Sequence, residues 1–247
     1  SLAGYWQHTI GLLPTTDFSY GARVQNTWLS ARDRLNPNAP GTFGFETAAL
    51  PLDSSETNYA LHVGLEHRFN NVFSVFGRAA HAFRTPNVEE RVSSGPLLPF
   101  APFPGPPQDF RLKTQTSHDI EGGVRVKAGA FHMQSSIYGM DLENEIHFIP
   151  ALFYNVNLDP TRRTGSETSA SLRVSDTVLL RGGMAYIRAV FREGQFEGKD
   201  VPLVSNYTAS GGVTWNIWQN YLVFDATLRA WSERIMDNDQ ANTQRRI

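Results

Sequence analysis

Polar and apolar residues alternate along most of this chain, and the alternation sharply limits the folds open to it. In residues 57–69, apolar side chains such as Tyr59 and Leu61 alternate with polar ones, and residues 206–217 and 222–230 repeat the pattern. Because successive side chains of a strand point to opposite faces, the pattern predicts strands with one apolar and one polar face. Helical periodicity is scarce. The chain is therefore predicted to be all-β.

The alternation predicts ten strands, many of them longer than ten residues, whereas strands of ordinary globular sheets have about five to six. Their predicted bounds are roughly 3–13, 17–31, 57–69, 72–84, 115–127, 129–142, 161–175, 177–192, 205–216 and 219–233.

The predicted connections alternate between short and long. Short turns are predicted near residues 14–16, 70–71, 127–129, 176 and 218–219, and long connections at 32–56, 85–114, 143–160 and 193–204. A strand that crosses a bilayer needs about 9–11 residues, and outer-membrane barrels have short periplasmic turns and long extracellular loops. The pattern thus predicts an antiparallel transmembrane β-barrel. The alternative is a water-soluble β-sandwich, whose strands would be shorter and whose loops would not sort into two length classes.

Composition narrows the chemistry further. The chain has no cysteine, which excludes thiol catalysis, disulfides and cysteine-ligated metals. Its net charge of −2 gives no indication of nucleic acid as a partner. The sequence contains no run of about 18 apolar residues, so no membrane-spanning helix is predicted. Both ends read as interrupted in mid-pattern, with no leader sequence, so we expect a piece of a longer protein.

The connection at 85–114 is rich in proline, at positions 96, 99, 102, 104, 106 and 107. In the barrel interpretation it is an extracellular loop, where long irregular backbone is tolerated. Proline stiffens it toward extended conformations, which lowers the cost of ordering it around a ligand. The alternative is a stiff spacer that contacts no ligand.

Four segments carry a family likeness. They are FGRAAHAFRTPNVEE (76–90), LKTQTSHDIEGGVRV (112–126), YNVNLDPTRRTGSETSASLRV (154–174) and VPLVSNYTASGGVTW (201–215). Their order and spacing resemble the barrel motifs of TonB-dependent outer-membrane receptors. The chain departs from that pattern at Thr114 and Gln115, where Pro-Glu is usual, and at Asn206, where proline is common. Residues 58–233 carry the resemblance.

The resemblance implies a barrel of 22 strands with a plug domain in its lumen. Such receptors import scarce nutrients across the bacterial outer membrane with energy from the TonB complex. Their cargo is most often a ferric siderophore, otherwise haem, cobalamin or a sugar. Residues 1–247 are then expected to be part of the barrel domain, with about ten of its strands and without the plug. Ten strands do not close at the 22-strand diameter.

The partners expected from this resemblance are a ferric siderophore or a similar large nutrient, the protein's own plug domain, the TonB complex and outer-membrane lipid. Nucleic acid is not expected. No resident cofactor is expected either, and iron enters only as part of a transported chelate.

Two charged residues in the shared motifs, Arg84 and Glu167, lie inside predicted strands. Facing the lumen, they would pair with the plug or with other lumen charges and hold the register there. The alternative is a solvated surface charge that contributes little.

Ligand contacts are predicted from loop position and residue type alone. Siderophores are anionic or carry aromatic iron-binding groups, so aromatic rings and cations in the predicted extracellular loops are the candidates. They are Phe103, Phe110, Arg111, His147, Phe153 and Tyr154.

No motif indicates catalysis or a metal site. The seven histidines form no His-x-His or His-x-x-x-His pair, so no protein-built metal site is predicted. The acidic cluster Asp141, Glu143 and Glu145 is typical of a solvated loop. The chain is predicted not to be an enzyme. The alternatives left open are a complete ten-stranded barrel acting as an outer-membrane enzyme, and a passive pore or adhesin.

Overall fold

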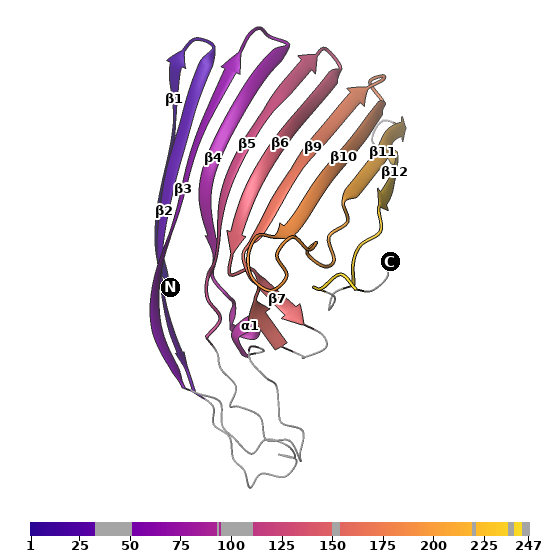
Figure 1. Cartoon of the computed structure of the whole chain (residues 1–247). Helices are drawn as coiled ribbons and strands as arrows, with labels where there is room; N and C mark the ends of the chain where they lie inside the picture. The colour runs from indigo at the N-terminus through magenta and orange to yellow at the C-terminus, as the bar shows by residue number, and fades with distance from the viewer. Residues whose placement is uncertain are drawn as a thin grey trace.

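The computed structural model describes residues 1–32, 51–92, 94, 111–149, 154–218, 221–236 and 240–243. Ten strands form one curved antiparallel sheet in the order β1-β2-β3-β4-β5-β6-β9-β10-β11-β12 (Figure 1). The strands are β1 Leu2–Leu13, β2 Thr16–Ala31, β3 Leu52–Arg68, β4 Phe73–Arg84, β5 Gln115–Ala128, β6 Phe131–Glu143, β9 Thr161–Arg173, β10 Val178–Phe191, β11 Tyr207–Trp218 and β12 Leu222–Trp231.

The predicted all-β antiparallel architecture and all ten predicted strands are confirmed. The largest difference in bounds is in β3, which begins at Leu52 rather than near residue 57. It is longer because it stays paired with β2 up to the Ala31–Leu52 pair. The ten strands form one sheet rather than the two packed sheets of a β-sandwich.

The two ends of the sheet differ in their connections. At one end, which we call the turn end, neighbouring strands are joined by turns such as residues 14–15, 69–72 and 129–130. At the other, the loop end, the connections span 32–51, 85–114, 144–160 and 192–206. The predicted alternation of short and long connections is confirmed.

Two of the long connections contain regular structure that the sequence did not predict. The helix α1 (Val88–Val92) follows β4, and a hairpin of β7 (Ile146–Ile149) and β8 (Tyr154–Asn157) lies between β6 and β9. The helix starts at a capping box, in which the Glu90 amide donates to Asn87 Oδ1 at 2.7 Å and the Asn87 amide donates to Glu90 Oε2 at 2.9 Å. The long connections are therefore not irregular throughout. Among the described residues, no helix is long and apolar enough to cross a membrane.

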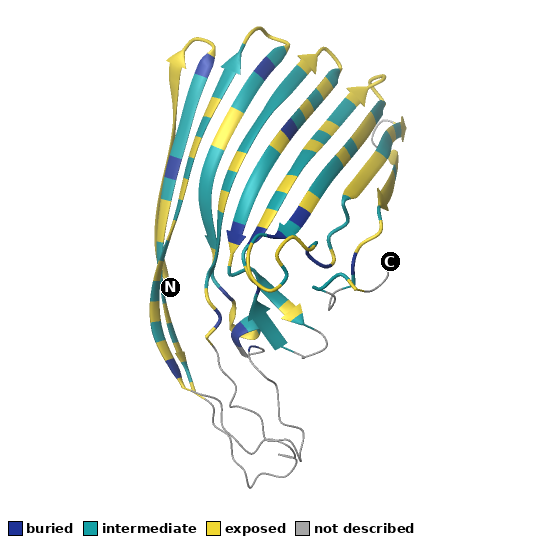
Figure 2. Ribbon diagram, viewed as in Figure 1, coloured by how far each residue is buried: buried dark blue, intermediate teal, exposed yellow. Residues whose placement is uncertain are grey.

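The register places apolar and polar side chains on opposite faces of the sheet. On β3, the rings and aliphatic chains of Tyr59, Leu61, Val63 and Leu65 are 47–53% exposed, on what we call the outer face. Cross-strand pairing continues this face onto its neighbours, and along the strands in Figure 2 exposed residues are interspersed with partly buried ones. The inner face is polar, and the loop-end segments lie against it through contacts such as that between Arg91 and Glu56.

The part of the chain that the structure describes has little conventional core. Its main cluster of buried apolar side chains lies at the loop end, where Leu158, Ala189, Phe191 and Val201 pack together. Elsewhere the outer face exposes large side chains, among them Ile120, Ile137 and Leu228 at 68–76% exposure. An exposed apolar surface of this extent marks contact with an apolar partner rather than with water.

Candidate functional site: the inner face and the loop end

The inner face carries charged side chains that the register brings together from distant parts of the chain. Several of them form ion pairs: Arg68 with Asp17, Arg78 with Asp119 and Glu121, Arg125 with Glu66, and Arg181 with Asp225. These groups remain partly exposed, so the pairs are solvated contacts on an open wall.

Arg125 is the centre of one connected group on the inner face. Its guanidinium pairs with Glu66, its Nε donates to Gln134 Oε1 at 2.9 Å, and it lies 4.2 Å from the ring centre of Phe76. Glu66 also accepts a hydrogen bond from Ser74 Oγ at 2.9 Å. Glu66 and Arg125 are 59 residues apart in sequence, so their pairing depends on the register of β3, β4 and β5.

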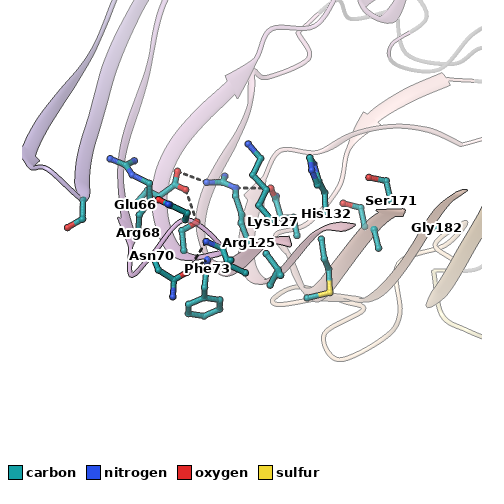
Figure 3. Close-up of a pocket in the computed structure, with 18 of the residues that line it drawn as sticks. Glu66, Arg68, Asn70, Phe73, Arg125, Lys127, His132, Ser171 and Gly182 are labelled. Atoms are coloured by element: carbon teal, nitrogen blue, oxygen red, sulfur yellow. Dashed lines mark hydrogen bonds and ion pairs between the residues drawn. The ribbon is translucent and has the colours of Figure 1, made fainter. Parts of the chain in front are cut away.

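A groove of about 800 Å³ lies on the inner face near the turn end (Figure 3). Its lining includes one acidic residue, Glu66, and five basic ones: Arg68, Arg125, Lys127, His132 and Arg181. Three of these cations are already in ion pairs, Arg68 with Asp17, Arg125 with Glu66 and Arg181 with Asp225, so the groove is a polar surface suited to hydrogen-bonded contacts rather than a strongly positive one.

Close packing of aromatic rings over glycine keeps parts of the inner face flat. Tyr138 lies opposite Gly165, and Phe76 lies opposite Gly123. A Cβ on Gly165 would lie 2.7 Å from the Tyr138 hydroxyl oxygen and would collide with the carbonyl oxygen of Tyr186. These rings thus lie along the wall, directly over the backbone of the neighbouring strand.

The loop end gathers polar contacts over the inner face. Arg163 forms an ion pair with Glu145, and Thr161 Oγ1 donates to Glu145 Oε2 at 3.1 Å. Thr161 is fully buried beside this pair. Glu145 was part of the predicted solvated acidic cluster, but the structure gives it two partners on β9 and makes it a structural anchor.

The sheet, its two faces and its two kinds of connection are the features of a known family of outer-membrane barrels. The profile of the family described as "TonB dependent receptor-like, beta-barrel" matches residues 1–246. The chain belongs to this family. Proteins of the TonB-dependent receptor family sit in the bacterial outer membrane.

Solved uptake receptors and transporters share the fold. The ferric yersiniabactin uptake receptor FyuA from Yersinia pestis has a TM-score of 0.71 at 18% identity, covering 96% of this chain and 35% of the receptor. The copper transporter OprC gives 0.65 at 15%, covering 94% and 35%. The unliganded ferric citrate transporter FecA gives 0.64 at 17%, covering 98% and 33%. No curated protein sequence matches the chain.

The chain thus spans about a third of the length of these solved receptors. Consistent with this share, its sheet is open: β1 and β12 are its two edge strands and do not pair with each other. A closed ten-stranded barrel therefore does not describe the structure. Each edge presents a row of backbone groups that further strands would pair.

The register places both predicted lumen residues on the inner face. Arg84 lies at the loop end of β4 and forms an ion pair with Glu90 of α1, so its acidic partner belongs to the same loop. Glu167 lies on β9, directly opposite Ser136 of β6. Their contact with a plug domain stays a prediction.

The predicted ligand contacts divide into two groups. Phe103, Phe110 and Phe153 lie outside the described residues. Arg111 is exposed in the segment before β5, while His147 and Tyr154 are partly buried on the β7–β8 hairpin. His147 pairs with Val156 and Tyr154 with Ile149, so both side chains share one face of the hairpin. A role in ligand binding stays a prediction for all six.

The sequence also missed a pair of histidines. His81 and His118 lie directly opposite each other on β4 and β5, with ring centres 4.4 Å apart. They share the outer face with Tyr59, whose ring centre lies 4.7 Å from that of His81, so His81 does not line the lumen. No group of three or more acidic or imidazole side chains is placed to hold a metal ion within the described ranges.

Proposed function

We propose that the protein to which this chain belongs imports a scarce nutrient across the bacterial outer membrane, with energy from the TonB complex. The observation that carries the proposal is the pair of opposed faces on a sheet of the receptor family, one apolar and one lined by paired charges. A channel wall in a membrane needs this arrangement, since lipid faces one side and water the other.

In this proposal each face has its own task. The outer face lies in outer-membrane lipid. The inner face holds the plug domain through polar contacts. The contact sites that we propose are Arg84, Glu167 and the groove beside Arg125 and Lys127. The loop end faces the medium and receives the nutrient. The protein acts as a transporter rather than an enzyme.

The proposed cargo is a ferric siderophore. Two of the solved relatives are named for ferric chelates, ferric yersiniabactin for FyuA and ferric citrate for FecA. A large chelate suits long extracellular loops, which can surround it with rings and cations. Iron is then part of the cargo, and the protein needs no cofactor of its own.

The test uses the full-length gene in its native cell. Uptake of iron-55 bound to a panel of siderophores is measured in the parent strain, in a strain lacking the receptor and in a strain lacking TonB. We expect one chelate to lose energy-dependent uptake in both deletion strains. Unchanged uptake of every chelate in the receptor deletion would remove the iron assignment, and uptake that persists without TonB would point to a passive pore.

A further inference from the structure

Three separate segments at the loop end are tied together by five side chains, which we call the rim clamp: Glu56, Arg91, Thr114, Asn155 and Asn157. The tied segments are α1, residues 111–115 and the β7–β8 hairpin. Each bond of the clamp involves a side chain, so the clamp adds to the backbone ladder of the main sheet.

The first half of the clamp is centred on Arg91, whose side chain is only 6% exposed. Its Nη1 donates to the Leu112 carbonyl oxygen at 2.9 Å, and its Nη2 lies 3.2 Å from Glu56 Oε1. Thr114 Oγ1 donates to the other oxygen of the same carboxylate at 2.9 Å. Glu56 on β3 therefore holds both ends of the connection between β4 and β5.

The second half is built from two asparagines on one face of β8. Asn157 accepts from the Lys113 amide at 2.8 Å and donates from Nδ2 to the Lys113 carbonyl oxygen at 3.1 Å. The same Nδ2 donates to the Asn144 carbonyl oxygen at 2.8 Å. Asn155 Nδ2 donates to the Glu90 carbonyl oxygen at 3.1 Å, beside a parallel bridge between Asn155 and Ser94.

The chemistry of these bonds requires the amide group. The Asn157 side chain accepts from the amide of Lys113 and donates to its carbonyl oxygen, as the backbone of a neighbouring strand would. A carboxylate of the same shape accepts but does not donate, and it would face two carbonyl oxygens.

We propose that the rim clamp makes α1, residues 111–115 and the β7–β8 hairpin one rigid unit, and that Asn157 is its central positioning residue. The unit fixes the place of His147 and Tyr154 relative to α1, so the nutrient meets a preformed part of the inlet. This last step rests on the proposed function. The rigidity does not.

Hydrogen exchange of the full-length receptor in detergent tests the rigidity without any ligand. In Asn157→Asp we expect the amides of 88–92 and 111–115 to exchange about tenfold faster, together with those of the hairpin, because segments joined by side-chain bonds open as one unit. The matched control is Asn26→Asp, since Asn26 Nδ2 also donates across strands, to Thr57 Oγ1 at 2.8 Å, but outside the clamp. Faster exchange confined to the hairpin in Asn157→Asp would overturn the proposal.

A milder pair of variants covers the case in which Asn157→Asp does not fold. Thr114→Val removes the hydroxyl that bonds Glu56, and Thr114→Ser keeps it. We expect faster exchange at 88–92 in the valine variant and wild-type exchange in the serine variant. Equal exchange at 88–92 in both variants would contradict the clamp.

The positioning role has its own readout in cells. Uptake of the ferric chelate that depends on the receptor is measured against concentration in Asn157→Asp. We expect a higher half-saturation concentration with the maximal rate retained. An unchanged half-saturation concentration would overturn the positioning role, whereas a failed import proposal would show as no receptor-dependent chelate at all.

Discussion

The outer and inner faces of the same strands are held by different physics. On the outer face, side chains such as Val63 and Ile120 are 47% and 68% exposed and need only an apolar surrounding. On the inner face, Arg125 depends on Glu66, Gln134 and Phe76 in fixed positions. The outer face is therefore specified by residue class, and the inner face by particular pairs. Substitutions at adjacent residues, which point to opposite faces, expose this difference.

The largest effect is expected from a charge on the outer face. Val63→Arg places a guanidinium near the centre of the apolar run of β3, where it costs about 2–4 kcal/mol of unfolding free energy in lipid. The control is His62→Arg, one residue away on the polar inner face, where we expect the added charge to cost less. Denaturant unfolding of the full-length receptor in lipid vesicles measures both. Equal losses in the two variants would show that the two faces of β3 do not differ in their surroundings.

A smaller effect is expected where an inner ring covers glycine. Gly165→Ala forces a methyl group against Tyr138 and the Tyr186 carbonyl, with a cost of about 1–3 kcal/mol in unfolding free energy. Gly139 lies on the next strand and points to the outer face, where an added Cβ meets nothing within 4 Å. Gly139→Ala should leave stability unchanged or slightly raised. If both alanines behave alike in the same unfolding assay, the packing of the inner rings is not as described.

The smallest effect is expected at the inner ion pair. Arg125→Met removes a partly exposed pair and a ring contact, which together contribute about 1 kcal/mol after allowance for solvent screening. Because screening by salt acts on the charge pair, the difference from wild type should shrink as sodium chloride rises to about 1 M. A difference that does not change with salt would assign the effect to packing on Phe76.

The strands and their two faces were predictable from the sequence, because a period of two sustained over ten or more residues is produced by little except a two-faced strand. The alternation of short and long connections was also predictable, because the lengths of the connections follow from the bounds of the predicted strands. The pairings on the inner face were not, since Glu66 and Arg125 belong to strands whose register no local pattern fixes.

The loop end was the least predictable region. Asn87 and Glu90, three residues apart, are the sequence signal for the start of α1. The same residues also belong to a family motif, so they were interpreted as part of that motif and not as a capping box. The clamp bonds of Asn155 and Asn157 reach backbone atoms, and backbone carries no sequence signature. Arg84 and Glu167 were predictable as inner-face residues from strand parity, whereas the ligand contacts rested on loop position alone.

The most direct test of the two opposed faces is nitroxide accessibility along β3. The chain has no cysteine, so single cysteines at positions 59–65 of the full-length receptor, made cysteine-free elsewhere, can carry one spin label each. In lipid vesicles we predict that labels at 59, 61, 63 and 65 collide mainly with oxygen, and labels at 60, 62 and 64 mainly with a water-soluble nickel chelate. Accessibility without this period of two, or with the two sets reversed, would contradict the account.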